Sequence, residues 1–282
     1  MNENQAIINI ETTGIDPHKN HIYLINIFTN DRYYNFYSKN NESEEKIIKS
    51  AYKILQNKQI ISFSEFDVKF INTKLIKYTE FDVINNCIYL QKLIRNYYNS
   101  KFTSLKAKNL ASKLFDINID DKSKSVNLYK KISKSNRISD ELIEFAKTSM
   151  SFKIKLYNYM REFFEENCDT FDVYTNFVRY LLYDIKKIKN NLEISLITDN
   201  NMEIDAMYES TQIKSQGMFI TLCLSLHEGY IEDDFVECSM TSMDNNYNLI
   251  NNYYPLVINN EEFIYDNIKE LVKYTLTEIF NE

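Results

Sequence analysis

The sequence lacks tryptophan and has only three glycines and two prolines among its 282 residues. Glycine and proline supply the backbone conformations that many tight turns require. Their scarcity argues against a many-turned β-sandwich and favours long helices joined by polar, asparagine-rich loops. A chain of this length can still bury a substantial core, as one large domain or two smaller ones.

Cysteines are few, and they stand far apart at positions 87, 168, 223 and 238, without a Cys-x-x-Cys pair or a nearby histidine cluster. This spacing is typical of buried small side chains in a reducing compartment and does not indicate a zinc site. The first five residues are polar and acidic, unlike a signal peptide. The longest apolar stretch, Met218–Leu226, is too short to cross a bilayer. We therefore expect a cytoplasmic protein with no membrane partner.

The net charge of −7 conceals two regions of opposite charge. Residues 1–165 contain 26 lysines and arginines against 19 acidic residues, whereas residues 166–282 contain 7 against 21. We expect a domain at 1–166 and an acidic C-terminal region at 167–282 that packs on it. The acidic residues between Glu228 and Glu237 are expected in a solvated loop, or alternatively on the basic surface of the first region.

Local patterns predict a mixed sheet with helices against both faces, because three strands are followed by alternating strand and helix. The predicted strands of the first region are 6–10, 22–29, 31–37 and 59–63, with Asn30-Asp31 as a turn. Its predicted helices are 42–55, 65–78, 87–98, 104–115 and 140–165. The second region is expected to be an α+β extension, with helices at 171–188 and 261–280 and strands at 192–197, 202–207 and 218–226.

Two polar side chains, Asn9 and Glu11, stand at the end of the first predicted strand, just before a Thr-Thr-Gly turn. Side chains alternate between the faces of a strand, so these two project together. A pair of acids in such a place is the opening of a two-metal nuclease site, because divalent ions need anionic oxygen ligands. Here one member is an amide, so we expect a nucleic-acid hydrolase scaffold that is altered where the chemistry would happen.

The segment Asn9-Ile10-Glu11-Thr12-Thr13-Gly14, followed by Asp16-Pro17, resembles the D-I-E-T-T-G-x-x-P opening of RNase H-like 3′–5′ exonucleases of the DEDD type. The stretch from Ile60 to Asp67 is similar to their second motif, with Ser64-Glu65 in place of an Asn-Gly turn. The stretch Phe145–Ser149 falls where their last motif stands.

Two further segments extend this resemblance over nearly the whole chain. Ser104–Lys106 together with Phe115–Ile117 resembles an element of the YprB-like branch. Tyr253–Leu256, followed by Glu261-Glu262, is similar to a segment in C-terminal extensions of some Firmicutes members.

The resemblance implies an α/β fold with an RNase H-like mixed β-sheet flanked by helices and a C-terminal α+β extension. It also implies that the family's four metal-binding carboxylates correspond to Asn9, Glu11, Asp67 and Ser149. Two of the four are therefore replaced, including the one that bridges the ions. Two divalent cations about 4 Å apart repel by roughly 16 kcal/mol at an effective dielectric constant near 20, so this loss is expected to abolish two-metal occupancy.

Three alternatives remain open for the two residual acids, Glu11 and Asp67. Lys153 lies four residues after Ser149, on the same helical face, so its ammonium group could stand near both acids in place of a metal. A single weakly bound Mg²⁺ on Glu11 and Asp67 is the second alternative. In the third, both acids lie in a cleft without a present role.

A basic cluster between Lys101 and Arg137 has ten basic residues against three aspartates. It is either a solvated helix surface or a nucleic-acid-binding surface. For the second case the candidate residues are Lys101, Lys106, Lys108, Lys113, Lys130 and Lys131.

We expect a catalytically inactive protein that binds single-stranded nucleic acid or a protein partner and has no resident cofactor. One alternative is an active 3′–5′ exonuclease that depends on Mg²⁺ or Mn²⁺ and uses an atypical ligand set. A second alternative is a protein-interaction module without nucleic-acid contact. The sequence does not indicate an oligomeric state.

Overall fold

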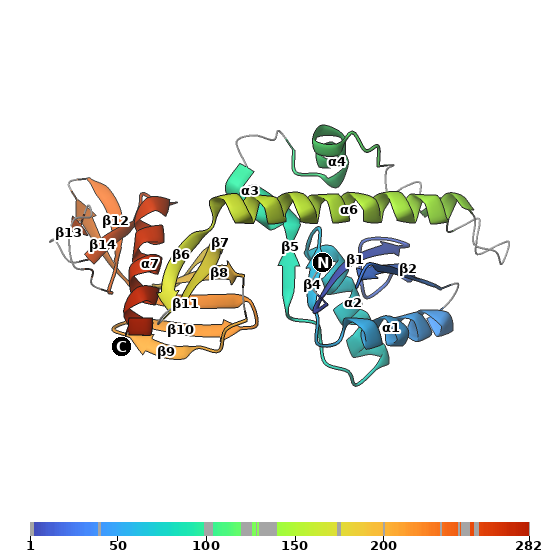
Figure 1. Ribbon diagram of the computed structural model, residues 1–282, viewed down its shortest axis with the longest axis horizontal. Coiled ribbons are helices and arrows are strands. Elements are labelled where there is room, and N and C mark those ends of the chain that lie inside the picture. The colour runs from blue at the N-terminus through green and yellow to red at the C-terminus, as the bar shows by residue number, and fades with distance from the viewer. Residues whose placement is uncertain are drawn as a thin grey trace. The chain divides into compact units, whose positions relative to one another are not determined.

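The computed structural model divides the chain into two compact units, residues 1–163 and 164–282 (Figure 1). The structure describes residues 3–38, 41–98, 104–119, 126–127, 129, 140–173, 176–199, 201–231, 233–241, 243, 249–250 and 254–281. Within these ranges no helix is long and apolar enough to cross a membrane.

The first unit is built on a mixed five-stranded sheet with the order β3-β2-β1-β4-β5. Its strands are β1 (Gln5–Thr12), β2 (Ile22–Thr29), β3 (Arg32–Tyr37), β4 (Gln59–Ser62) and β5 (Cys87–Tyr89). Strand β1 pairs antiparallel with β2 and parallel with β4, so the predicted mixed sheet is confirmed.

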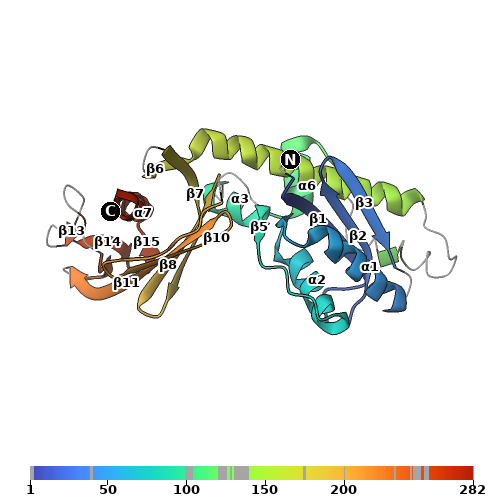
Figure 2. The same cartoon turned by 60° about the horizontal axis from the view of Figure 1, so that its bottom comes forward.

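Helices cover both faces of this sheet (Figure 2). On one face, α1 (Asn41–Leu55) and α2 (Glu65–Tyr78) form a core with the strands. On the other face, α6 (Asp140–Asn167) packs Leu142, Phe145 and Ala146 against Tyr23 and Leu24 of β2. Since side chains alternate along β1, Ile8 and Ile10 enter the first core, and Asn9 and Glu11 face α6.

One helix prediction in this unit is only partly correct. Residues 87–98 form strand β5 and then α3 (Leu90–Tyr98). Cys87 and Ile88 pair with Ile60 and Ile61 of β4, and this parallel pairing extends the sheet by one strand. A three-residue apolar strand cannot be distinguished from the start of a helix by periodicity alone. Helix α4 (Ala107–Phe115) begins three residues later than predicted.

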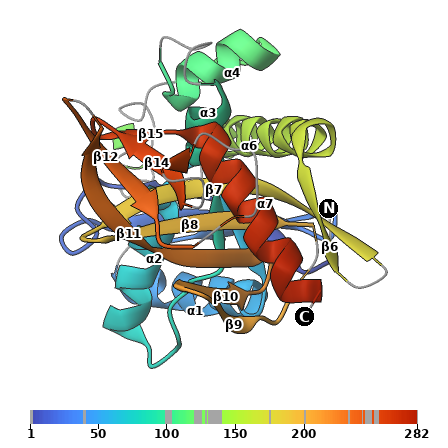
Figure 3. The same ribbon diagram turned by 90° about the vertical axis from the view of Figure 1, so that its left-hand side faces the viewer.

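The second unit is an antiparallel sheet with one helix, α7 (Tyr265–Asn281), packed on it (Figure 3). Its main path of strands runs β13-β14-β12-β11-β8-β7-β6, and β10, β9 and β15 pair beside this path. The strands are β6 (Asp169–Val173), β7 (Asn176–Ile188), β8 (Asn191–Thr198), β9 (Asp205–Tyr208), β10 (Thr211–Gln216), β11 (Phe219–Ile231), β12 (Asp234–Ser239), β13 (Leu249–Ile250), β14 (Tyr254–Asn259) and β15 (Glu262–Phe263). Helix α7 contributes Ile268, Leu271 and Leu276 to the core of this unit. They pack there with strand residues such as Ile194 and Leu222.

The helix predicted at residues 171–188 is wrong, because β6 and β7 form a hairpin there. Val178, Tyr180 and Leu182 alternate toward the core of the second unit, which is the spacing of a strand. The charged residues after Leu182 follow a bulge in the β7–β8 pairing, which disturbs the alternation that would have revealed the strand.

The solvated acidic loop expected between Glu228 and Glu237 is also wrong. Glu228 lies in β11, directly opposite Glu237 of β12. Glu237 is fully buried and forms an ion pair with Lys187 of β7. The ammonium group of Lys187, 50 residues away in the sequence, therefore compensates the charge of the buried Glu237 carboxylate.

Turns in both units are formed almost without glycine. The turn between β2 and β3 places Asn30 and Asp31 in the left-handed region, at φ 51° and 55°, which confirms the predicted turn. In the second unit Lys189, Glu209 and Asn260 adopt the same conformation at hairpin ends. This costs a non-glycine residue roughly 1–2 kcal/mol. Scarce glycine therefore did not exclude a strand-rich region, contrary to the expectation from composition.

Candidate functional site

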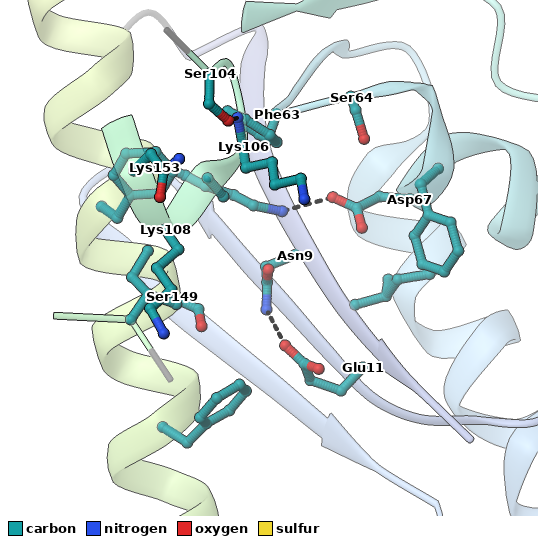
Figure 4. A pocket seen from close by; sticks show the side chains of 17 residues that line it. Asn9, Glu11, Phe63, Ser64, Asp67, Ser104, Lys106, Lys108, Ser149 and Lys153 are labelled. Carbon is teal, nitrogen blue, oxygen red and sulfur yellow. Dashed lines mark hydrogen bonds and ion pairs between the residues drawn. The ribbon is translucent and has the colours of Figure 1, made fainter. Parts of the chain in front are cut away.

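A cavity of about 780 Å³ opens in the first unit, within the size range of small-molecule sites. It brings together the four positions predicted from the sequence (Figure 4). Asn9 and Glu11 come from β1, Asp67 from the first turn of α2, and Ser149 from α6. Positions up to 140 residues apart in the sequence thus line one space.

The two side chains from β1 are hydrogen-bonded to each other. Asn9 and Glu11 are both buried, and Asn9 Nδ2 donates to Glu11 Oε1 over 3.3 Å. An amide offers two N–H donors as well as an acceptor, whereas a carboxylate can only accept when ionised. The amide at position 9 therefore stabilises the carboxylate of Glu11 by donating a hydrogen bond to it.

Asp67 is held by two donors from other elements. Its Oδ2 accepts a hydrogen bond from Ser62 Oγ over 2.8 Å and from Lys153 Nζ over 2.5 Å. Its place in the first turn of α2 also suits a negative charge, because the N-terminus of a helix carries a partial positive charge.

Lys153 lies on the buried face of α6, with 6% of its surface exposed. Its ammonium group also donates to the carbonyl oxygen of Ile8, 3.0 Å away. Of the three alternatives for the residual acids, the first, which placed this ammonium group near both, is confirmed at Asp67. At Glu11 the structure gives a hydrogen bond from Asn9.

Ser149 stands one helical turn before Lys153, and only 7% of its surface is exposed. Figure 4 shows its side chain pointing into the cavity. Within the part of the chain that the structure describes, its hydroxyl group makes no hydrogen bond.

The residues present do not fit a centre of two divalent ions. Two carboxylates, one amide and one hydroxyl line the positions where the family resemblance implies four carboxylates. Among the described residues, no group of three or more histidine, cysteine, aspartate or glutamate side chains could hold a metal ion. The Lys153 ammonium already occupies one oxygen of Asp67 and would repel a cation there.

Two of the six candidate nucleic-acid-binding lysines line this cavity. Lys106 and Lys108 reach into it from the start of α4 (Figure 4). Lys113 is exposed on the same helix but does not line the cavity. Lys101, Lys130 and Lys131 lie outside the described residues.

The sequence interpretation missed the apolar walls of the cavity. Phe63, Phe66, Phe145 and Phe152 line it, together with Ile119. The rings of Phe63 and Phe152 have centroids 5.7 Å apart. In the sequence these residues are indistinguishable from ordinary core positions, since nothing in their spacing indicates that a cavity adjoins them.

The sequence also gave no sign of a buried polar cluster around Glu44, which is 0% exposed. One carboxylate oxygen accepts from the backbone N–H of Ile22 over 2.7 Å and lies 3.3 Å from Lys74 Nζ. The other accepts from Tyr78 Oη over 2.6 Å and lies 3.2 Å from His21 Nδ1. Burial alone would raise the pKa of Glu44, but the His21 ring beside it and the hydrogen bonds from Tyr78 and Ile22 outweigh burial and lower this pKa to about 2.

This cluster fixes the loop that follows the site strand. Lys74 Nζ donates to the carbonyl oxygen of Asn20, and the backbone N–H of Thr13 donates to the carbonyl oxygen of His21. Thr13 comes two residues after Glu11, so the cluster helps to set where β1 ends.

The mixed sheet order, the helices on both faces and the polar cavity at the end of β1 define an RNase H-like α/β fold. Residues 6–161 match the family model of the RNase H superfamily. The chain belongs to this superfamily.

Several solved nuclease structures are similar to this chain at low sequence identity. NrnC of Brucella melitensis with bound Mg²⁺ is 16% identical, with a TM-score of 0.40 over 58% of this chain and 74% of that one. The Nibbler EXO domain of Aedes aegypti is 14% identical, with a TM-score of 0.39 over 56% and 81%. Exonuclease I with bound product is 12% identical, with a TM-score of 0.35 over 68% and 57%. No curated protein matches the sequence.

Proposed function

We propose that this chain is a non-hydrolytic member of the RNase H superfamily that binds single-stranded nucleic acid. The observation that carries the proposal is the ammonium group of Lys153, which lies 2.5 Å from Asp67 Oδ2. This fixed cation supports the proposal, because metal-dependent hydrolysis would need an exchangeable cation at Asp67 instead.

Hydrolysis by two metal ions requires one ion to activate water and another to stabilise the leaving oxygen. An amide at position 9 and a hydroxyl at position 149 are neutral, so they cannot balance the charge of two ions. We assign Asn9, Glu11, Asp67 and Ser149 to the four carboxylate positions of the family, with two replaced. On the resemblance of Ser104–Lys106 and Phe115–Ile117, we place the chain in the YprB-like branch.

Nucleic-acid binding is supported by the basic residues at the cavity. Lys106 and Lys108 bring positive charge to its lining, and the phosphate backbone provides most of the affinity of sequence-independent binding. Aromatic side chains that line the same cavity, such as Phe63 and Phe145, offer surfaces on which bases can stack.

One experiment tests both parts of the proposal. End-labelled single-stranded DNA and RNA are incubated with the protein in Mg²⁺ or Mn²⁺, beside a Glu11→Ala variant. Binding is followed by fluorescence anisotropy between about 50 and 200 mM salt. We expect no cleavage above that of Glu11→Ala, and binding that weakens as salt rises.

The other outcomes identify the rival functions. Cleavage that disappears in Glu11→Ala would establish an active exonuclease with an atypical ligand set. Absence of both cleavage and binding at the lowest salt would favour a protein-interaction module.

A further inference from the structure

The cavity has the properties of an anion site rather than a cation site. Resting on the proposed function, we propose that it binds the phosphate of a nucleotide directly through Lys106 and Lys108, without a metal ion. The nucleotide is either free or the terminal residue of a strand, since both present the same phosphate, sugar and base.

The first argument is the charge that remains after the internal contacts are made. Three lysines line the cavity, Lys106, Lys108 and Lys153, against the two carboxylates Glu11 and Asp67. Both carboxylates already accept hydrogen bonds from the protein, Asp67 from Lys153 and Glu11 from Asn9. Lys106 makes no ion pair within the part of the chain that the structure describes. Among the described residues, Lys106 therefore brings an ammonium group without an ion pair to the side of the cavity formed by α4.

The second argument is the set of hydrogen-bond donors on the cavity wall. The start of α4, residues 106–109, lines the cavity, and helix N-termini attract anions. The side chain of Lys106, the N-cap residue, makes no capping hydrogen bond to this helix. Ser149 faces the same space from α6, nine-tenths buried and without a hydrogen bond among the described residues. This hydroxyl group lines the cavity and can donate a hydrogen bond to an oxyanion bound there.

The third argument is the shape of the rest of the cavity. Beside the lysines, its walls are the apolar side chains of Phe63, Phe145 and Ile119. A volume of about 780 Å³ is ample for a phosphate with a sugar and a base. An inorganic anion would leave these apolar walls without a contact, so the combination of lysines and rings favours a nucleotide.

Isothermal titration calorimetry on the full chain tests the proposal, with EDTA present to remove metal ions. The ligands are AMP, adenosine, inorganic phosphate and a short single-stranded oligothymidylate. We expect AMP to bind at least about tenfold more tightly than adenosine or phosphate, because only AMP uses the lysines and the rings together. Replacing EDTA by Mg²⁺ should not increase the affinity.

Three variants locate the binding. The double variant Lys106→Ala/Lys108→Ala is expected to weaken AMP binding by about tenfold or more, since each charge-assisted hydrogen bond to phosphate is lost. The matched double variant Lys106→Arg/Lys108→Arg should retain most of the affinity. Lys155→Ala removes an exposed lysine of α6 that does not line the cavity and should leave AMP binding unchanged. Equal melting temperatures of all variants would show that the fold is intact.

The results separate this proposal from the proposed function. If AMP binds only with Mg²⁺, or if the double alanine variant binds AMP like the wild type, the cavity proposal is wrong. If the oligothymidylate binds but AMP does not, the cavity proposal fails and nucleic-acid binding by another surface stands. If nothing binds, both fail. Oligothymidylate binding that is lost together with AMP binding in the double variant would identify a strand end as the ligand.

Discussion

Two buried pairs of a carboxylate and an ammonium group lie in the first unit, and α2 contributes to both. Glu44 and Lys74 meet between α1 and α2, while Asp67 and Lys153 meet between α2 and α6. The carboxylate of Glu44 is surrounded by protein donors on both oxygens. The carboxylate of Asp67 instead lines an open cavity.

The difference shows how one chemical pair serves two purposes. Where every partner comes from the protein, as at Glu44, the pair holds helices and a loop together. Where one side faces a cavity, as at Asp67, the same pair stands beside a space that a ligand can enter. Variants of each pair should therefore differ in what they change.

The largest loss of stability is expected when the closed pair is broken. Glu44→Ala leaves Lys74 buried without its acid, so the free energy of unfolding should fall by about 3–5 kcal/mol. Urea denaturation of wild type and variant measures this difference in the free energy of unfolding. Glu45→Ala, on the next residue of α1, removes only a partly exposed pair with Lys49 and should cost about 0.5 kcal/mol or less. Similar losses in both variants would contradict a special role for the Glu44 cluster.

Breaking the cavity pair should cost somewhat less, because Asp67 faces a cavity that solvent can enter. Lys153→Met is expected to lower the free energy of unfolding by about 2–3 kcal/mol. It leaves the buried Asp67 carboxylate with the Ser62 hydroxyl as its donor among the described residues. Adding Asp67→Asn should recover part of this loss, since the uncompensated charge is then gone. Lys155→Met, at an exposed position on the same helix, is the control. A double variant less stable than Lys153→Met would exclude the charge argument.

The low pKa of Glu44 predicts how stability depends on pH. A carboxyl group whose pKa is about 2 in the folded protein, below its ordinary value of 4.5, stabilises the fold above pH 4.5. This contribution is lost as pH falls from 4.5 toward 2. Between about pH 5 and pH 3, the stability difference between wild type and Glu44→Gln should shrink by about 2 kcal/mol. A difference that stays constant over this range would show that Glu44 is not the titrating group.

The smallest energetic effect is expected from rebuilding the cation site. Asn9→Asp with Ser149→Asp restores two anionic oxygens, and Mn²⁺ affinity measured by calorimetry should rise by about tenfold over wild type. Adding Lys153→Ala should raise it further, because the competing ammonium group is removed. Ser112→Asp with Asn118→Asp adds the same charge at exposed positions and should not change the affinity. No gain in the cavity variants would show that the four positions are wrongly assigned.

Several elements of the first unit could be predicted because their signals are local. Strand β2 was predicted with its observed bounds from a run of apolar residues, and α1 from the helical spacing of its apolar side chains. Alternation along β1 indicated that Asn9 and Glu11 share a face, and the spacing of four residues placed Lys153 beside Ser149.

Other elements could not be predicted because they depend on distant partners. Strand β5 exists through its pairing with β4, and β7 through its pairing with β6 and β8. Glu237 is buried because Lys187 reaches it from another strand. A short apolar run or an acidic residue has no local signal for such a neighbour, so the sequence patterns indicated a helix or a loop instead.

The sequence by itself determined which chemical groups this protein has for the site: an amide and a hydroxyl at two positions, carboxylates at two others, and nearby lysines. The kind of group and its donors and acceptors belong to the residue type, whatever its surroundings. Only the tertiary structure decided that Lys153 touches Asp67 across 86 residues of sequence, and that Lys106 and Ser149 face one cavity. Contacts of this kind arise from the packing of α2, α4 and α6 around the sheet, because electrostatic and hydrogen-bond energies fall steeply with distance.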